Sequence, residues 1–332
     1  MVRPFKQEAY NHSLKNANNG IIHPVLACVR LTRKCNLRCA YCSELYVNTG
    51  KDLKQNDWKN AVDVIYKLGN RDIVFTGGEP LLRSDLVDIV RHASSRDAFV
   101  SIATNGLLLD KKYLADLSDA KLDFLCISVD TLNKNSAWGK PLTDKLAQTL
   151  EHISKSNYGF DTTVSTVVTR HNLMELPEIV SYFSSLKIPT KLMIMMQNHI
   201  NKNNTKALSL EKNSAEIEVI VKKLLMMKNE GALLMDGDFT LSRLSQYFKG
   251  EFNYNCNGGV YDLSVNNDGK LVICPNGIIS DKSIFDLTTK KYVEFIEENK
   301  TITDNCKGCL WSFKQRLEDS IKNYGVVKNE KN

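Results

Sequence analysis

The sequence predicts an α/β protein: a partial (β/α)6 barrel of parallel strands, followed by a small C-terminal cysteine-rich domain. Short β-branched and apolar runs alternate with amphipathic helical patterns from residue 25 to residue 196, as a parallel sheet with helical crossovers requires. After residue 251 the pattern changes to a compact segment that contains Gly and Cys. We therefore divide the 332 residues into a barrel at 1–200, a helical linker at 201–250 and the cysteine-rich domain at 251–332.

Six apolar segments are predicted as the strands of the barrel. Most are rich in β-branched residues, as strands buried on both faces are. They span residues 25–32, 72–76, 98–103, 123–129, 162–168 and 191–196. A doubly wound dinucleotide-binding sheet is the rival fold, but no G-x-G-x-x-G follows the first strand. In a barrel of this kind the active site lies at the carboxyl ends of the strands.

Helical periodicity fills the connections between these strands. Apolar residues recur at helix spacing from Trp58 to Leu68, and Gly69 follows as a C-terminal stop. The same spacing marks helices near residues 86–90, 173–183, 210–229 and 241–248, and residues 197–205 are predicted as a loop. The segment 261–273 is predicted as a hairpin with an Asn-Asp-Gly turn at 267–269.

Composition excludes several classes of function. Hydrophobic residues make up 42% and charged residues 25% of the chain, and no run of about 18 apolar residues predicts a membrane span. The N-terminus lacks the apolar region of a signal peptide. The net charge of +6 is mild, and no basic stripe with interleaved aromatic residues indicates nucleic acid as a partner. We expect a cytoplasmic protein that contacts neither nucleic acid nor membrane.

Cysteine spacing carries the main functional signal. Nine cysteines are many for the cytoplasm, where disulfides are disfavoured, so clustered cysteines indicate metal or redox chemistry. Cys35, Cys39 and Cys42 follow the first strand with gaps of three and two residues. Three thiolates on one loop can bind three irons of a [4Fe–4S] cluster and leave the fourth iron open. A zinc loop is the alternative, but structural zinc sites usually take four protein ligands.

These residues resemble the radical S-adenosylmethionine (SAM) superfamily. The hallmark of that family is C-x3-C-x2-C with an aromatic residue before the last cysteine, and Tyr41 stands at that position. The resemblance implies that SAM chelates the open iron. It also implies that an electron from the cluster cleaves SAM to a 5′-deoxyadenosyl radical, and that the neighbourhood of Tyr41 lies beside the adenine.

Three further strand ends carry residues that the resemblance assigns to SAM. Gly77 and Gly78 allow the backbone to approach a ligand closely, and Glu79 with nearby carbonyls can accept from the methionine ammonium group. Thr104 and Ser128 are implied to contact the methionine carboxylate or the ribose. A hydroxyl at a strand end is also a common helix cap or turn residue, which is the alternative for these two positions.

A second group comprises Cys256, Cys274, Cys306 and Cys309. The first two flank the predicted hairpin, and the last two form a C-x2-C pair. Four thiolates can fully ligate a second [4Fe–4S] cluster, whereas a structural zinc is the alternative. The spacing resembles the auxiliary-cluster regions called SPASM and twitch. Four cysteines instead of the seven of a full SPASM region indicate the shorter twitch type.

Together these patterns predict a radical SAM oxidoreductase with two [4Fe–4S] clusters and SAM as cofactors. The favoured reaction is the oxidation or epimerisation of a small molecule such as a sugar or aminocyclitol. The alternative is a maturase that crosslinks or epimerises a ribosomally made peptide, although only 34 residues precede Cys35, too few for a peptide-binding domain. A non-catalytic redox or scaffold protein would leave the SAM motif unexplained. The expected partners are this small-molecule or peptide substrate and an electron donor such as flavodoxin or ferredoxin.

No catalytic base or hydrogen donor can be named from the sequence. Because side chains alternate along a strand, Cys28, Arg30 and Thr32 share one face, and we expect that face to point into the barrel. Cys126 shares a face with Ser128 by the same argument. A thiol there is a hypothetical hydrogen-atom donor, and packing as a small buried hydrophobe is the alternative.

Overall fold

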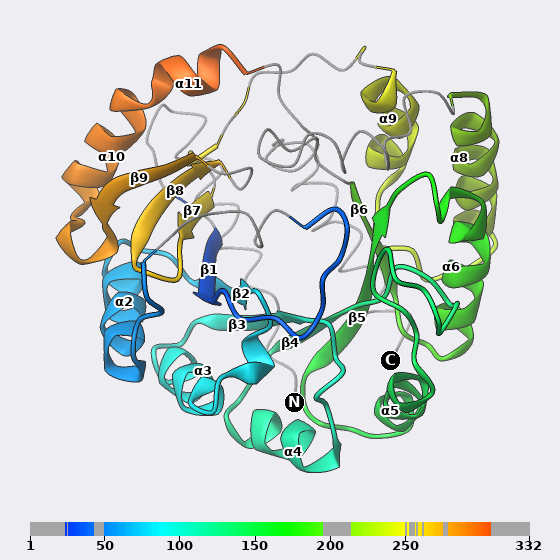
Figure 1. Ribbon diagram of the computed structural model, residues 1–332, viewed down its shortest axis with the longest axis horizontal. Helices are drawn as coiled ribbons and strands as arrows, with labels where there is room; N and C mark the ends of the chain where they lie inside the picture. Colours follow the sequence, from blue (N-terminus) through cyan, green and yellow to red (C-terminus); the bar gives the residue numbers. More distant parts are fainter. Residues whose placement is uncertain are drawn as a thin grey trace.

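In the computed structural model, residues 24–306 are described apart from 25, 43–49, 195–213, 250, 252–255, 257, 261 and 275–277. Within these residues one sheet runs in the order β6-β5-β4-β3-β2-β1-β7-β8-β9 (Figure 1). The six predicted barrel strands are present and pair in parallel, which confirms the predicted fold class. They are β1 Leu26–Thr32, β2 Asp72–Gly77, β3 Phe99–Thr104, β4 Phe124–Ser128, β5 Asp161–Val168 and β6 Thr190–Ile194.

Helices cover the outside of this curved sheet (Figure 1). They are α2 Gln55–Lys67, α3 Leu86–Ser95, α4 Lys111–Asp119, α5 Asp144–Ser154 and α6 Leu176–Ser185. The sequence patterns above do not include α4 and α5. Both begin at a capping side chain, because Asp110 accepts from the Tyr113 amide at 2.7 Å and Thr143 from the Leu146 amide at 3.2 Å. Asp and Thr are preferred N-cap residues, so these two positions could have indicated from the sequence where the helices begin.

The two faces of β1 differ in chemistry, as the alternation predicts. Ala27, Val29 and Leu31 are fully buried in the apolar core. Cys28 and Arg30 therefore lie on the opposite face, toward the barrel interior. By the strand register this interior also includes apolar side chains such as Val74, Phe99 and Phe124. Its polar residues and thiols include Asp72, Ser101, Cys126, Thr163, Ser165, Lys191 and Ser264.

The cysteine-rich segment continues the barrel sheet. Strand β7 (Asp262–Val265) pairs in parallel with β1, and β8 (Lys270–Cys274) and β9 (Ile278–Ser283) follow as antiparallel strands. The predicted hairpin is present, and Gly269 at φ +81° closes its turn by donating to the Asn266 carbonyl at 2.9 Å. In the sheet, β1 thus lies between β2 of the barrel and β7 of the hairpin.

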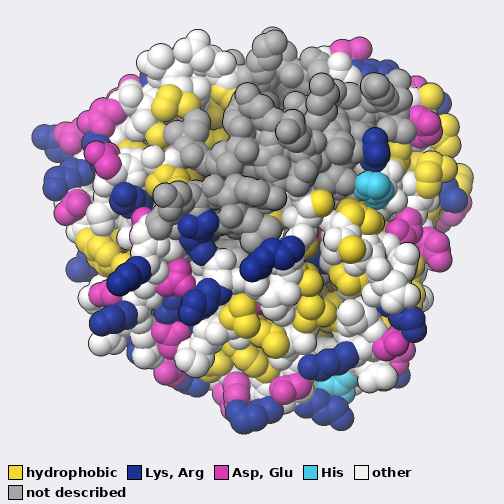
Figure 2. All heavy atoms as spheres, viewed as in Figure 1, with side chains coloured by type: hydrophobic (Ala, Val, Ile, Leu, Met, Phe, Trp, Pro, Cys, Tyr) yellow, Lys and Arg dark blue, Asp and Glu magenta, His cyan; other side chains and the backbone are white. Residues whose placement is uncertain are grey.

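The remaining helices lie on either side of the sheet in Figure 1. They are α8 Ser214–Asn229, α9 Asp238–Phe248, α10 Thr289–Glu298 and α11 Lys300–Asp304. The first two match predicted helices, whereas β9, α10 and α11 were not predicted. The predicted loop at 197–205 lies outside the described residues. No helix in the part of the chain that the structure describes is long and apolar enough to cross a membrane. On the face shown in Figure 2, acidic and basic side chains are interspersed over the described surface.

Candidate active site

The loop that leaves β1 carries the first three cysteines at the carboxyl edge of the sheet. The Leu37 amide donates to the Cys35 sulfur at 3.4 Å, and the Cys42 amide donates to the Cys39 carbonyl at 3.0 Å, which closes a turn. Burial raises the pKa of the Cys39 thiol to about 11, an effect that Lys140 opposes. Cys42 and Cys35 also act electrostatically on the Cys39 thiol, so both lie near it.

The donor set of this loop fits an iron–sulfur cluster. In the described residues no group of three or more His, Cys, Asp or Glu side chains is arranged to hold one metal ion. Each thiolate of a cubane binds a different iron, so the sulfurs need not converge on one point. Cluster binding would also remove the proton from the buried Cys39 thiol, because ligating cysteines are deprotonated.

The glycines at the end of β2 contact the loop that carries Cys35, Cys39 and Cys42, which we call the cluster loop. The Gly78 amide donates to the Thr32 carbonyl at 2.7 Å, and the Glu79 amide donates to the Lys34 carbonyl at 2.7 Å. A Cβ on Gly78 would overlap the Lys34 carbonyl oxygen and lie 2.7 Å from that of Arg33. The lack of side chains at these glycines thus allows the backbone of the loop that carries the cysteines to approach closely. The predicted contact of Gly77 and Gly78 with SAM stays a prediction.

Glu79 ties three strand ends together. Its side chain is 1% exposed, and Oε1 accepts from Thr104 Oγ1 at 2.6 Å and from the Leu81 amide at 3.0 Å. Oε2 accepts from the Asn105 amide at 2.8 Å, and Asn105 Nδ2 donates to Asn36 Oδ1 in the cluster loop at 2.7 Å. Burial raises the pKa of this carboxyl, although the hydrogen bonds oppose that effect. The predicted SAM contacts of Glu79 and Thr104 stay predictions, and sequence reasoning missed Asn36 and Asn105.

Ser128 ends β4 on the interior face. Its hydroxyl lies 3.2 Å from the Ser165 hydroxyl on the neighbouring strand β5. Burial raises the pKa of Cys126, two residues earlier on the same face, and a hydrogen bond with Ser165 opposes this shift. The structure thus places Ser128 beside further interior hydroxyls, and its contact with SAM stays a prediction.

Tyr41 takes part in a buried polar network that the sequence analysis missed. Its hydroxyl donates to Asp130 Oδ2 at 2.5 Å, and Lys140 Nζ donates to the same hydroxyl. Asp130 is fully buried and also accepts from the backbone amides of Lys140 at 2.8 Å and Val167 at 2.9 Å. Burial and the neighbouring Asp130 raise the pKa of the Tyr41 phenol well above its usual value. Asp130 belongs to the Ile-Ser-Val-Asp run that ends in the loop after β4, which was the available signal.

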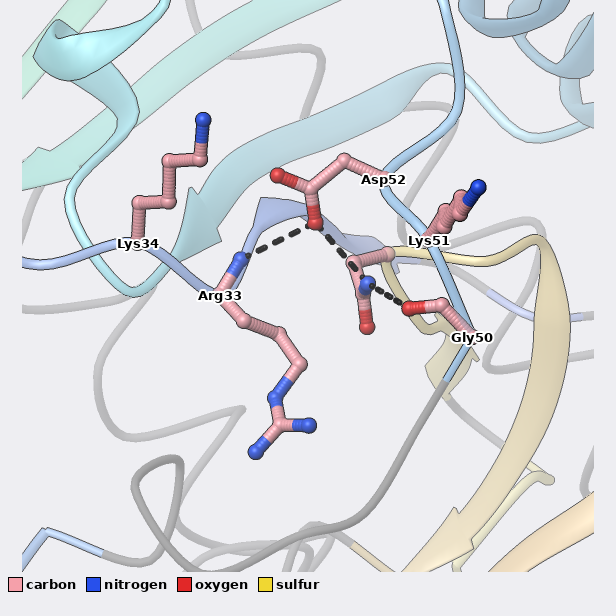
Figure 3. Close-up of a pocket in the computed structure, with 6 residues that line it drawn as sticks. Arg33, Lys34, Gly50, Lys51 and Asp52 are labelled. Carbon is pink, nitrogen blue, oxygen red and sulfur yellow. Dashed lines mark hydrogen bonds between the residues drawn. The ribbon is translucent and has the colours of Figure 1, made fainter.

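A pocket of about 490 Å³ lies between the start of the cluster loop and the β7–β8 turn (Figure 3). Asp52 links two sides of this pocket, because its Oδ1 accepts from the Arg33 amide at 3.3 Å and from Asn267 Nδ2 at 2.9 Å. Oδ2 accepts from Thr32 Oγ1 at 2.5 Å. Asn267 Nδ2 also donates to the Gly50 carbonyl at 3.0 Å. The hairpin turn is thereby joined to the loop that holds the first cysteine group.

The segments that carry Cys256, Cys274 and Cys306 of the second cysteine group meet around Gly258. Its amide donates to the Cys256 sulfur at 3.4 Å. A Cβ there would lie 3.0 Å from the Ile273 carbonyl, next to Cys274, and 4.0 Å from Thr303. The Cys306 amide in turn donates to the Thr303 carbonyl at 3.1 Å. Cys309, the fourth predicted ligand, lies outside the described residues.

The barrel and its three-cysteine loop place the chain in a known class. Residues 29–208, more than half of the chain, match the family described as "Radical SAM superfamily", so the protein belongs to the radical SAM superfamily of enzymes. Membership implies a [4Fe–4S] cluster and SAM as cofactors. The resemblance of the cysteine motif to this family is thereby confirmed.

Particular relatives differ in reaction. The chain is 32% identical over 168 residues to the PqqA peptide cyclase of Bradyrhizobium diazoefficiens. The matched stretch covers 47% of this chain and 42% of that protein. It is 44% identical over 109 residues to the GTP 3′,8-cyclase of Limosilactobacillus fermentum, which covers 31% of this chain and 32% of that protein. The chain thus spans less than half the length of the curated relatives it matches.

Two solved structures share the fold at low sequence identity. Streptococcus suis SuiB bound to the precursor peptide SuiA superposes with a TM-score of 0.66 and 15% identity, over 96% of this chain and 74% of that one. The protein anSMEcpe with bound AdoMet and Kp18Cys peptide gives a TM-score of 0.60 and 18% identity, over 92% of this chain and all of that one. At these identities the similarity supports the fold.

Replacing Gly78 by alanine is expected to displace the cluster loop. The new Cβ meets backbone oxygens that cannot rotate away, and such overpacking typically costs about 1–3 kcal/mol. Iron bound after anaerobic reconstitution should fall in Gly78→Ala, as measured by iron per chain and visible absorbance. Gly159→Ala is the matched control, because nothing lies within 4 Å of its Cβ and φ +78° adds only backbone strain of about 1–2 kcal/mol. Equal iron loading of Gly78→Ala and wild type would contradict this role.

Proposed function

We propose that the protein is a radical SAM maturase that crosslinks or epimerises a peptide. The observation that carries this proposal is the similarity to PqqA peptide cyclases, which extends over 168 residues. The similarity to GTP 3′,8-cyclases covers a shorter stretch of 109 residues. The comparisons therefore favour the peptide alternative over the sugar or aminocyclitol substrate that the cysteine pattern suggested.

Cys35, Cys39 and Cys42 would hold the catalytic cluster. When bound, the cluster and SAM supply the reductive cleavage that begins hydrogen abstraction from the substrate. Surrounding hydrogen bonds hold the residues of the site in place. Glu79 connects the ends of β2 and β3, and Asp130 accepts from the Tyr41 hydroxyl. A low-potential donor such as flavodoxin or ferredoxin would supply the electron.

The SAM contacts we propose are those at the strand ends. Gly77 ends β2 and is followed by Gly78 and Glu79, Thr104 ends β3 and Ser128 ends β4. All lie at the edge of the sheet where the cluster loop leaves β1. Parallel strands bring their carboxyl ends to one edge, which is where barrel active sites lie. Glu79 would act there through the hydrogen bonds that position Thr104 and Asn105.

We further propose that Cys256, Cys274, Cys306 and Cys309 bind an auxiliary [4Fe–4S] cluster of the twitch type. The convergence of the segments that carry Cys256, Cys274 and Cys306 around Gly258 supports a shared site. Full thiolate ligation would leave no open iron, so this cluster would serve electron transfer.

Iron content tests the two-cluster proposal. Anaerobically reconstituted wild type should contain about eight irons per chain, and replacement of Cys35, Cys39 and Cys42 by alanine should leave about four. Alanine at Cys256, Cys274 and Cys306 should likewise leave about four. Cys28→Ala serves as the control and should keep the wild-type value. Zinc in the C-terminal site of anaerobically purified protein would overturn the auxiliary-cluster proposal.

Product analysis tests the peptide proposal. Short peptides encoded beside the gene are incubated with reduced enzyme and SAM, and the products are examined by mass spectrometry. A crosslink removes two hydrogens, whereas epimerisation in deuterated water introduces one deuterium. The triple alanine variant of the first cysteine group should leave every peptide unchanged. If an amino sugar or aminocyclitol is turned over and no peptide is, the substrate is a small molecule instead.

A further inference from the structure

The segment after β4 lies across the cluster loop. The Ala40 amide donates to the Trp138 carbonyl at 2.9 Å, between Cys39 and Cys42 in sequence. Two residues later in that segment, Lys140 reaches the cluster loop with its side chain. Its Nζ lies 4.9 Å from the centre of the Tyr41 ring and 3.6 Å from Asp130 Oδ2. A cation is therefore placed beside the residues that flank two of the three cysteines.

This cation is held firmly and stays charged. Only 20% of the Lys140 side chain is exposed, and Asp130 beside it is fully buried. Burial lowers the pKa of Lys140, but Asp130 and the sulfurs of Cys39 and Cys42 raise it, and the pKa ends above its usual value. The ammonium group therefore carries its full charge at neutral pH.

The negative charge of Asp130 is stabilised by several donors besides the Lys140 ammonium group. They are the Tyr41 hydroxyl and the backbone amides of Lys140 and Val167. In a partly buried site, screening by water and salt is weak, so the charge of Lys140 acts strongly on a neighbouring redox centre.

We propose that Lys140 is a positioning residue that raises the reduction potential of the cluster bound by Cys35, Cys39 and Cys42. One-electron reduction adds one negative charge to the site, and a fixed cation beside it stabilises the reduced form. Asp130 and Tyr41 hold the ammonium group in place, so the segment after β4 sets how readily the cluster accepts an electron. The inference rests on the family's cluster and is independent of the substrate.

The test is an EPR-monitored redox titration of the full-length reconstituted protein, with dithionite as the reductant. The spectrum of the Cys35, Cys39 and Cys42 triple alanine variant is subtracted to isolate the first cluster. Lys140→Met should make the midpoint potential more negative by roughly the equivalent of a tenfold change in the reduction equilibrium, about 59 mV for one electron. Lys140→Arg keeps the charge and should restore most of the wild-type value.

Two charge controls separate electrostatics from structural damage. Lys34→Met removes a lysine next to Cys35 in sequence, but its side chain is exposed and screened, so the potential should change little. Asp130→Asn removes a negative charge and should shift the potential in the opposite direction to Lys140→Met. An unchanged potential in Lys140→Met, or a shift of the same sign in both variants, would overturn the proposal.

A second pair of variants, Tyr41→Phe and Asp130→Asn, tests the proposal if the Lys140→Met protein does not bind the first cluster. Tyr41→Phe removes a hydrogen bond of the network without changing its charge, whereas Asp130→Asn changes the charge. The proposal expects a more positive potential in Asp130→Asn than in Tyr41→Phe. Equal potentials in these two variants would show that the network acts through structure alone.

Discussion

The close contact between the turn after β2 and the loop after β1 is the constraint on which the rest of the site depends. Two backbone hydrogen bonds of 2.7 Å join them, from the amides of Gly78 and Glu79 to the carbonyls of Thr32 and Lys34. Side chains at 77 and 78 would collide with that backbone, so the contact requires glycine. The buried Glu79 carboxylate accepts a hydrogen bond from the Asn105 amide at the end of β3. The Asn105 side chain in turn donates to Asn36 in the cluster loop. A loop of three cysteines is thereby held by neighbouring strand ends.

Strand β1 connects the two cysteine groups. Its carboxyl end carries the first group, and β7 pairs along its free edge to bring in the hairpin that carries Cys274. Asp52 and Asn267 add a second connection between the hairpin turn and Thr32. On the other side of the cluster loop, Asp130 and Lys140 fix Tyr41. The cluster loop is therefore held from β2, from the hairpin and from the segment after β4.

Much of this arrangement could be predicted from the sequence because its signals are local. The six strands, the three-cysteine loop and the hairpin turn each depend on residues within about ten positions of one another. Helices α4 and α5 were missed although Asp110 and Thr143 cap them. The parallel pairing of β7 with β1 joins residues more than two hundred positions apart, and no local pattern encodes it. The same holds for Lys140, whose importance comes from a contact with Tyr41 across 99 positions. Glu79 illustrates a third case, since its residue type was noted but its buried partners could be found only in three dimensions.

The most direct test of the central claim is the cleavage of SAM by the reduced protein. Anaerobically reconstituted protein is reduced with dithionite, and 5′-deoxyadenosine and methionine are quantified by chromatography over time. We predict that both products form in equal amounts and that neither forms when Cys35, Cys39 and Cys42 are replaced by alanine. Absence of both products from fully loaded, reduced wild-type protein, with its substrate present, would contradict the central claim.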